Sequence, residues 1–266
     1  MTFAKKLTTA TLLGLAAFSF SGLVLADETF MFNTAKSGSG DGNAWTYDSS
    51  GGYSVTATAW SDTEEISGSD RLETAQLAYY SGSGLGVRNR NGGNEDQSCC
   101  EHSMDNYRDD DFILFEFKNT ATGLNQDVTL KSVDLGWLSS DSDLTILAFT
   151  NPAASSAVDP ASGGLAGWRQ SELIGANSGW TRIDLDGDGT SASLAPRSVG
   201  AGTITSSWWV VGAKFGDYND YVKLASLVAV IPVRPPLDNN VPVPASIFLI
   251  AVGLVGIQRF RTSRLA

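Results

Sequence analysis

The sequence predicts an all-β protein built as an antiparallel β-sandwich of the jelly-roll kind. Between the two chain ends the apolar runs are short and rich in β-branched and aromatic residues, and Gly, Ser, Asn and Asp separate them. Residues 53–59 alternate with period two, whereas no run keeps a helical period over three turns. The chain has 266 residues, of which 42% are hydrophobic and 10% aromatic, enough for one sizeable β domain with its own core.

The expected strands follow from these runs. In chain order they are residues 53–60, 72–80, 112–117, 128–138, 144–149, 180–185, 208–215 and 221–230. Stretches rich in Gly, Ser and Asn, expected to be flexible, occupy residues 37–42, 81–84, 88–93 and 151–167. The last of these is expected to be a surface loop, where binding residues often lie.

Acidic residues dominate the middle of the chain. All 29 Asp and Glu residues lie between positions 27 and 238, whereas five of the 18 Lys and Arg residues lie outside that span, which leaves 13 basic residues and a net charge of −16. A surface so acidic repels phosphates, so nucleic acids are excluded as partners. It attracts cations instead.

The N-terminal segment has the pattern of a secretory signal peptide. Lys5 and Lys6 precede an apolar stretch that ends at Ala26, and acidic residues follow at once. We therefore expect residues 1–26 to be a signal peptide that signal peptidase cleaves after Ala26. An uncleaved anchor is the alternative, which the short apolar part disfavours.

The C-terminal segment, residues 237–266, is expected to include a membrane-spanning helix. Residues 245–257 would span about 20 Å as a helix, and residues 241–260 about 30 Å, the thickness of the hydrocarbon core. Arg259, Arg261 and Arg264 then form a basic cap that would stay in the cytoplasm. A C-terminal core helix is the alternative. It fits less well because the upstream segment, rich in Pro and Asn, has the composition of a linker.

This tail resembles the PEP-CTERM sorting domain of exosortase substrates. The resemblance is carried by a Pro-x-Pro signature, an apolar run and a terminal arginine cluster, and the signature residues are Val241, Pro242, Val243, Pro244 and Ala245. It implies transit through the inner membrane of a Gram-negative bacterium, cleavage near the signature by an exosortase-type enzyme, and delivery to the cell surface or exopolysaccharide matrix. The commonest form has Glu where Val243 stands, which implies a different subclass of processing enzyme. The exported body is then residues 27–236.

The segment around His102 also resembles exosortase-dependent surface proteins, which carry a His-x-x-Asp-Asn segment before a central strand. Here it is formed by His102, Asp105 and Asn106, ahead of Phe112. This resemblance supports the surface-protein interpretation and implies no enzymatic mechanism.

Two acidic segments are candidate calcium sites. Asp184, Asp186 and Asp188, followed by Gly189, match the opening of a calcium loop, although position 12 of that loop is Ala195 rather than Glu. The alternative is a β-turn, which Asp-Gly favours. Asp105, Asn106 and Asp109 are weaker candidates within a dense acidic patch that a solvated loop would also explain. No cofactor is required, and calcium is the one that the pattern allows.

His102 is the single histidine, which excludes zinc sites that need several. A Ser-His-Asp triad needs only one, but no Gly-x-Ser-x-Gly elbow is present. We expect His102 to be a structural residue beside Glu101 and Asp105, and we assign no catalytic residue.

Two pairs of adjacent residues complete the candidate sites. Cys99 and Cys100 allow a strained vicinal disulfide, which we favour, two free thiols, or bridges to another chain. Trp208 and Trp209 must point to opposite faces of a strand, which makes the pair a candidate place for stacking of sugar rings.

Three functional hypotheses follow. The first is a non-enzymatic surface or matrix protein that contacts exopolysaccharide or neighbouring proteins and that calcium stiffens. The second is a carbohydrate-active enzyme or glycan-binding module on the same scaffold. The third is a single-pass membrane protein whose tail is never cut.

Overall fold

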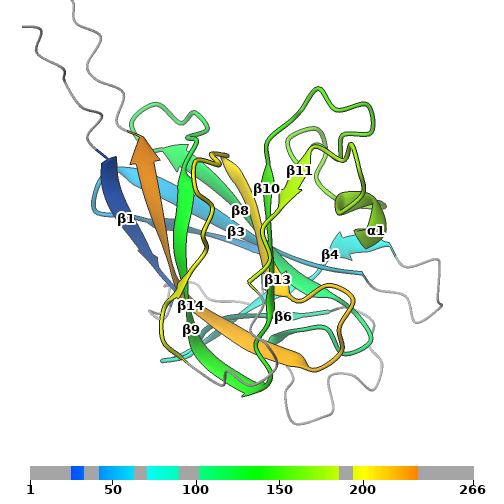
Figure 1. Ribbon diagram of the computed structural model, residues 1–266. Helices are drawn as coiled ribbons and strands as arrows, with labels where there is room; N and C mark the ends of the chain where they lie inside the picture. Colours follow the sequence, from blue (N-terminus) through cyan, green and yellow to red (C-terminus); the bar gives the residue numbers. More distant parts are fainter. Residues whose placement is uncertain (1–24, 33–41, 63–70, 90–101, 186–193, 233–266) are drawn as a thin grey trace, which may run out of the picture. The chain divides into compact units, whose positions relative to one another are not determined.

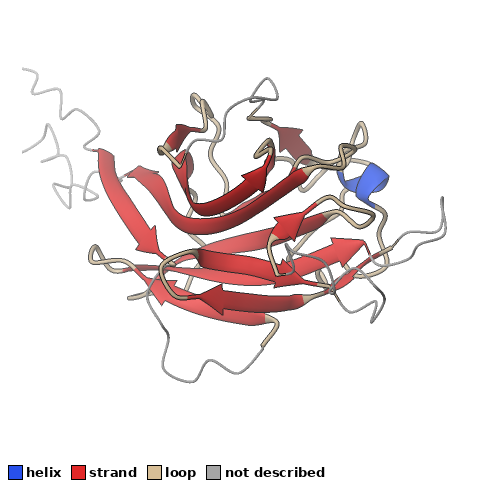
Figure 2. Cartoon of the chain, turned by 90° about the horizontal axis from the view of Figure 1, so that it is seen from below, coloured by secondary structure: helices blue, strands red, loops and turns tan. Residues whose placement is uncertain are grey.

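The computed structural model describes residues 25–32, 42–62, 71–89, 102–185 and 194–232. The chain divides into a unit of residues 25–232 and a second unit formed by the remaining residues of both ends. The first unit consists of two antiparallel sheets that face each other in two layers (Figures 1 and 2). The prediction of an all-β fold with two antiparallel sheets is confirmed.

The first sheet, sheet A, is organised around one long strand, β14. This strand pairs with β9 along most of its length and with β1, β6 and β7 on its other side. The strands of sheet A are β1 (Leu25–Met31), β5 (Gln76–Tyr80), β6 (Gly84–Arg88), β7 (Met104–Asp105), β9 (Thr129–Ser140), β12 (Arg197–Ser198) and β14 (Asp220–Pro232).

The second sheet, sheet B, has the strand order β11-β10-β13-β8-β3-β2, and β4 pairs with the far end of β3. Its strands are β2 (Ala44–Asp48), β3 (Tyr53–Asp62), β4 (Leu72–Thr74), β8 (Asp111–Asn119), β10 (Leu144–Phe149), β11 (Trp180–Arg182) and β13 (Trp208–Ala213).

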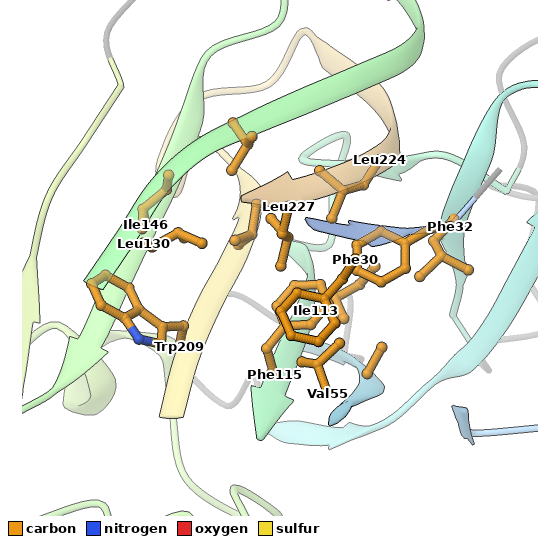
Figure 3. Close-up of a cluster of buried hydrophobic side chains, with 14 of the residues drawn as sticks. Phe30, Phe32, Val55, Ile113, Phe115, Leu130, Ile146, Trp209, Leu224 and Leu227 are labelled. Atoms are coloured by element: carbon orange, nitrogen blue, oxygen red, sulfur yellow. The ribbon is translucent and has the colours of Figure 1, made fainter. Parts of the chain in front are cut away.

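The main core lies between the two sheets. Alternate residues of each strand point inward, as period-two burial requires, and the enclosed side chains come from both layers (Figure 3). Trp209 and Phe115 of sheet B face Phe30, Leu130 and Leu227 of sheet A within this single cluster, and all five are fully buried. Burial of these large apolar groups is the main favourable term in folding of the unit.

The expected strand over residues 72–80 is divided between the two sheets. It breaks at Ala75, so that β4 pairs in sheet B and β5 in sheet A. Asn43 stabilises the crossing because its side-chain amide donates to the carbonyl oxygens of Ala59 and Ala75, at 2.9 and 2.7 Å. A continuous apolar run does not reveal such a crossing.

The expected surface loop over residues 151–167 is in part a packed cover. Together with the short helix α1 (Gln170–Leu173), it lies over the outer face of sheet B, where Val158, Leu165 and Leu173 are fully buried. This second apolar cluster includes Trp60 and Phe112 of sheet B. The loop is therefore held by its own hydrophobic contacts.

Candidate functional site

Three carboxylates from different strands converge at one end of the sandwich. Asp141 and Asp143 lie in the tight connection between β9 and β10, and Asp220 is the first residue of β14. One oxygen from each lies within 4.8 Å of the others. Asp220 is fully buried and Asp143 is 4% exposed. We call these three residues the acidic edge.

Asn106 holds Asp220 through a reciprocal pair of hydrogen bonds. The Asn106 side-chain amide donates to Asp220 Oδ2 at 2.6 Å, and the Asp220 backbone N–H donates to Asn106 Oδ1 at 2.9 Å. The other Asp220 oxygen accepts from the Asp143 backbone N–H at 2.8 Å. Both carboxylate oxygens of Asp220 thus have a protein donor, which is what burial of a charged group requires.

Burial raises the pKa of Asp220 to about 6. The hydrogen bonds from Asp143 and Asn106 oppose this rise, and the nearby charges of Asp141 and Asp143 add to it. The ammonium group of Lys214 lies 3.4 Å from Asp143 Oδ2 and offsets part of the negative charge. Such a set of oxygens could hold a hard cation such as Ca²⁺.

A second acidic contact joins sheet B to its covering loop. The backbone N–H of Asp110 donates to Asp62, and the side chain of Gln170 on α1 donates to Asp110. Burial, followed by the negative charge of Asp62, raises the pKa of Asp110 to about 8, although a hydrogen bond from the Gly216 backbone lowers it. Asp110 is therefore mostly protonated at neutral pH.

The proposed calcium loop is described only at its start. Asp184 forms an ion pair with Arg182, with a distance of 2.7 Å from Nε to Oδ1, and Asp186 and Asp188 lie outside the described residues. Strand β11 ends at Arg182, but Leu185 is bridged to Leu144, the residue after Asp143. The carboxylate group formed by Asp141, Asp143 and Asp220 does not include Asp184.

The weaker calcium candidates, Asp105, Asn106 and Asp109, have different hydrogen-bond partners. Asn106 lies at the acidic edge, whereas Asp105 accepts hydrogen bonds from Ser103 Oγ and from the Tyr107 backbone, both at 3.2 Å. Asp109 accepts from the side-chain amide of Asn89 at 3.1 Å. Sequence reasoning missed Asp141, Asp143 and Asp220 because strands far apart in the chain bring them together. The spacing Asp-Ser-Asp at 141–143 was the available signal.

His102 is held by Arg88 and an aromatic ring. The Arg88 guanidinium donates to His102 Nδ1 at 2.8 Å, and Tyr80 stacks on the imidazole with 5.9 Å between ring centroids. Glu101, one of its expected neighbours, lies outside the described residues. His102 thus has a hydrogen-bonding partner on β6 and a stacking partner on β5.

The two adjacent tryptophans point to opposite faces, as the sequence predicts. Trp209 is fully buried in the main core, and its indole N–H donates to the Ser206 carbonyl at 2.9 Å. Trp208 is half-buried on the outer face of sheet B. Of this pair, Trp208 alone can meet a partner in solution.

The remaining predicted sites lie at or beyond the limits of the described residues. Cys99, Cys100 and the whole C-terminal tail, including its signature and basic cap, are outside them. Ala26 lies within β1, opposite Ile231 of β14, so cleavage after Ala26 would retain residues 27–31 of that strand. The described residues contain no helix of the length and hydropathy that a membrane span needs.

Comparison with known proteins finds no matching family model, curated protein or solved structure.

Proposed function

We propose that this chain is an exported, non-enzymatic protein of the bacterial cell surface or exopolysaccharide matrix, sorted by a detachable tail. One observation carries the proposal. The folded unit begins at Leu25 and ends at Pro232, close to the limits of 27 and 236 that the sequence assigns to the exported body. Cuts at the two proposed processing sites would therefore remove only Leu25 and Ala26 from the folded unit.

The positions of the two ends fit this route. Leu25 of β1 and Pro232 of β14 are paired neighbours in sheet A, so the folded unit begins and ends at the same end of adjacent strands (Figure 1). A signal peptidase acting after Ala26 would remove only the first two residues of β1, and an exosortase-type enzyme acting near Pro242-Val243-Pro244 would cut beyond the last residue of β14.

Three finer features belong to the same proposal. The two sheets form a jelly-roll-like sandwich, the segment after Ala245 is a transmembrane sorting helix capped by Arg259, Arg261 and Arg264, and the inner membrane of a Gram-negative bacterium is the intermediate location. The length of the apolar run and the basic residues that follow it support the transmembrane helix and its orientation.

Calcium is proposed as a stiffening ion rather than a catalytic one. Two observations support it: the sequence offers a calcium-loop opening at Asp184, Asp186 and Asp188, and Leu185 within this motif is bridged to Leu144, the residue after Asp143. An ion bound there would neutralise buried carboxylates and tie together the ends of β9, β10 and β14.

The sorting proposal is tested by changing the signature. Replacing Pro242 and Pro244 with Ala should move the protein from the surface and medium fractions of its native host to the inner-membrane fraction, with the tail intact on mass spectrometry. Pro235→Ala, outside the signature, is the matched control and should leave the distribution unchanged. A wild-type chain that stays in the inner membrane with its tail intact would contradict the proposal and support the stably anchored alternative.

A further inference from the structure

A row of outward-pointing side chains crosses sheet B from one edge to the other. The strand registers place Trp208 opposite Glu116, Glu116 opposite Thr56, and Thr56 opposite Thr46. Because Ala148 pairs with Trp209, the next residue, Phe149, comes beside Trp208, and Phe149 pairs with Trp180. We call the six residues Trp180, Phe149, Trp208, Glu116, Thr56 and Thr46 the sheet B row.

The alternation of the strands places the whole row on the outer face. The residues adjacent to it in sequence, including Ala148, Trp209, Phe115 and Val55, point into the main core. Every member of the row is half-buried or exposed, and Trp180 and Trp208 also pack against the second apolar cluster, where the Trp180 indole N–H donates to the Val158 carbonyl at 2.9 Å. The strands follow one another in the order β11, β10, β13, β8 and β3 in Figure 1, and β2 completes the sheet.

One half of the row is aromatic and the other half is polar. Phe149 and Trp180 pack with 5.2 Å between ring centroids, next to Trp208. The hydroxyl groups of Thr46 and Thr56 lie 2.9 Å apart at the other end. At the usual spacing between strands, the part from Trp208 to Thr46 is about 14 Å long, which suits a short oligosaccharide segment.

Asn125 and Lys118 fix the centre of the row. With its side-chain amide in the orientation that satisfies both neighbours, Asn125 donates to Glu116 Oε1 at 3.2 Å and accepts from the Trp208 indole N–H at 3.3 Å. Lys118 lies 2.7 Å from the other Glu116 oxygen. These contacts restrict the side chains before any partner arrives, which lowers the entropy cost of binding.

We propose that the sheet B row binds a neutral polysaccharide chain. A pyranose ring has apolar C–H faces that pack on an indole ring and hydroxyl groups that bond to carboxylate, amide and hydroxyl oxygens, and the row offers both in order. Charge complementarity favours a neutral polysaccharide over an anionic one. Glu116 and Lys118 cancel each other, while the surrounding protein is strongly acidic and repels polyanions. The inference rests on the proposed function because it names the matrix component that the exported body contacts.

The test is migration of the full chain in native gels that contain a polysaccharide, with the same nonionic detergent throughout. The neutral probes are hydroxyethylcellulose, galactomannan and dextran, and alginate is the anionic probe. We expect slower migration in at least one neutral gel and unchanged migration in alginate. Trp208→Ala should weaken that binding at least tenfold, and Thr46→Ala, an exposed change that leaves the packing intact, severalfold.

Tyr218→Ala is the matched control, because Tyr218 is an aromatic residue outside the row that is 74% exposed. It should bind as the wild type does. Slower migration in none of the neutral gels, slower migration in alginate alone, or equal binding by the wild type, Trp208→Ala and Thr46→Ala would each overturn the inference. None of these results would alter where the tail is cut, so the glycan-binding proposal can be contradicted while the sorting proposal still holds.

Discussion

At the scale of single residues, Asn106 is the contact on which the acidic edge depends. It satisfies one oxygen of a fully buried carboxylate and the backbone N–H of the same residue, and it also donates to the Lys214 carbonyl at 2.8 Å. The sequence singled out Asn106 as a candidate ligand, but it could not show that its partner would be Asp220, which lies 114 residues further along the chain.

Replacing Asn106 with Ala should destabilise the protein by about 1–3 kcal/mol, because it leaves buried charged and polar groups without a donor. The free energy of unfolding in urea measures this effect. Gln126→Ala is the control, because the Gln126 amide makes an exposed bond to the neighbouring carbonyl, and it should change stability by less than about 0.5 kcal/mol. Equal effects of the two substitutions would contradict the assigned role of Asn106.

Asp110 should make stability depend on pH. Its pKa is about 8 in the folded protein, whereas the ordinary value for an aspartate is 3.8, so the folded chain binds the extra proton between these values. This contribution is fully present below about pH 4 and is lost as pH rises through about 8. Asp220, whose pKa is about 6, contributes with the same sign up to that pH.

The unfolding free energy of the wild type should fall between pH 4 and pH 8. Asp110→Asn should reduce the slope of this fall by an amount that corresponds to up to about one bound proton. The variant should be more stable than the wild type at pH 9 and similar to it at pH 3, where the wild-type carboxyl is protonated. Denaturant unfolding at pH 3, 5, 7 and 9 gives the comparison. An unchanged slope would show that Asp110 ionises normally in the folded state.

At the scale of secondary-structure elements, the longer runs of β-branched and aromatic residues were predictable, whereas β1, β2 and β6 were among the strands that were missed. The run over residues 144–149 coincides with β10, whereas β6 was missed because Gly84 and Gly86 weaken the strand pattern. The structure gives a reason for Gly86. A Cβ atom there would lie 1.7 Å from the His102 carbonyl oxygen, so the close approach of the two segments requires glycine.

Gly86→Ala should cost about 1–3 kcal/mol or more, because the backbone at His102 must move. Urea unfolding again provides the measurement. Gly123→Ala is the comparison, because Gly123 has a positive φ but a Cβ atom added there would meet nothing within 4 Å, so it reports backbone strain alone. A smaller loss at Gly86 than at Gly123 would mean that the two segments are not in close contact.

The acidic edge should respond to calcium because it brings together three carboxylates from the ends of three strands. Millimolar Ca²⁺ should raise the thermal midpoint relative to a sample with chelator, since an ion that binds only the folded state stabilises it by mass action. Asp143→Asn should reduce the rise. An equal midpoint with calcium and with chelator would remove the metal proposal and leave the edge as a hydrogen-bonded clamp.

At the scale of the whole molecule, period-two alternation and turn residues were sufficient to predict two antiparallel sheets, because both are local properties of the chain. The acidic edge and the sheet B row were not predictable. Trp208, Glu116, Thr56 and Thr46 become neighbours only through strand order and register, which depend on packing of the entire core. The sequence singled out the pair Trp208 and Trp209 without showing which of them faces outward, and it did not identify the polar neighbours of Trp208.

The same scale explains how export and folding can be compatible. The described members of the main core lie between Phe30 and Ile231, and among the described residues the predicted leader contributes only Leu25 and Ala26, at the start of β1. Removal of the predicted leader and tail would therefore leave the main core of the protein unchanged.

The most direct measurement is the intact mass of the native protein released from the cell surface. We predict a chain that starts at Asp27 and stops close to Pro244, without the apolar run and its three arginines. Recovery of the surface protein with residues 245–266 still attached would contradict the account.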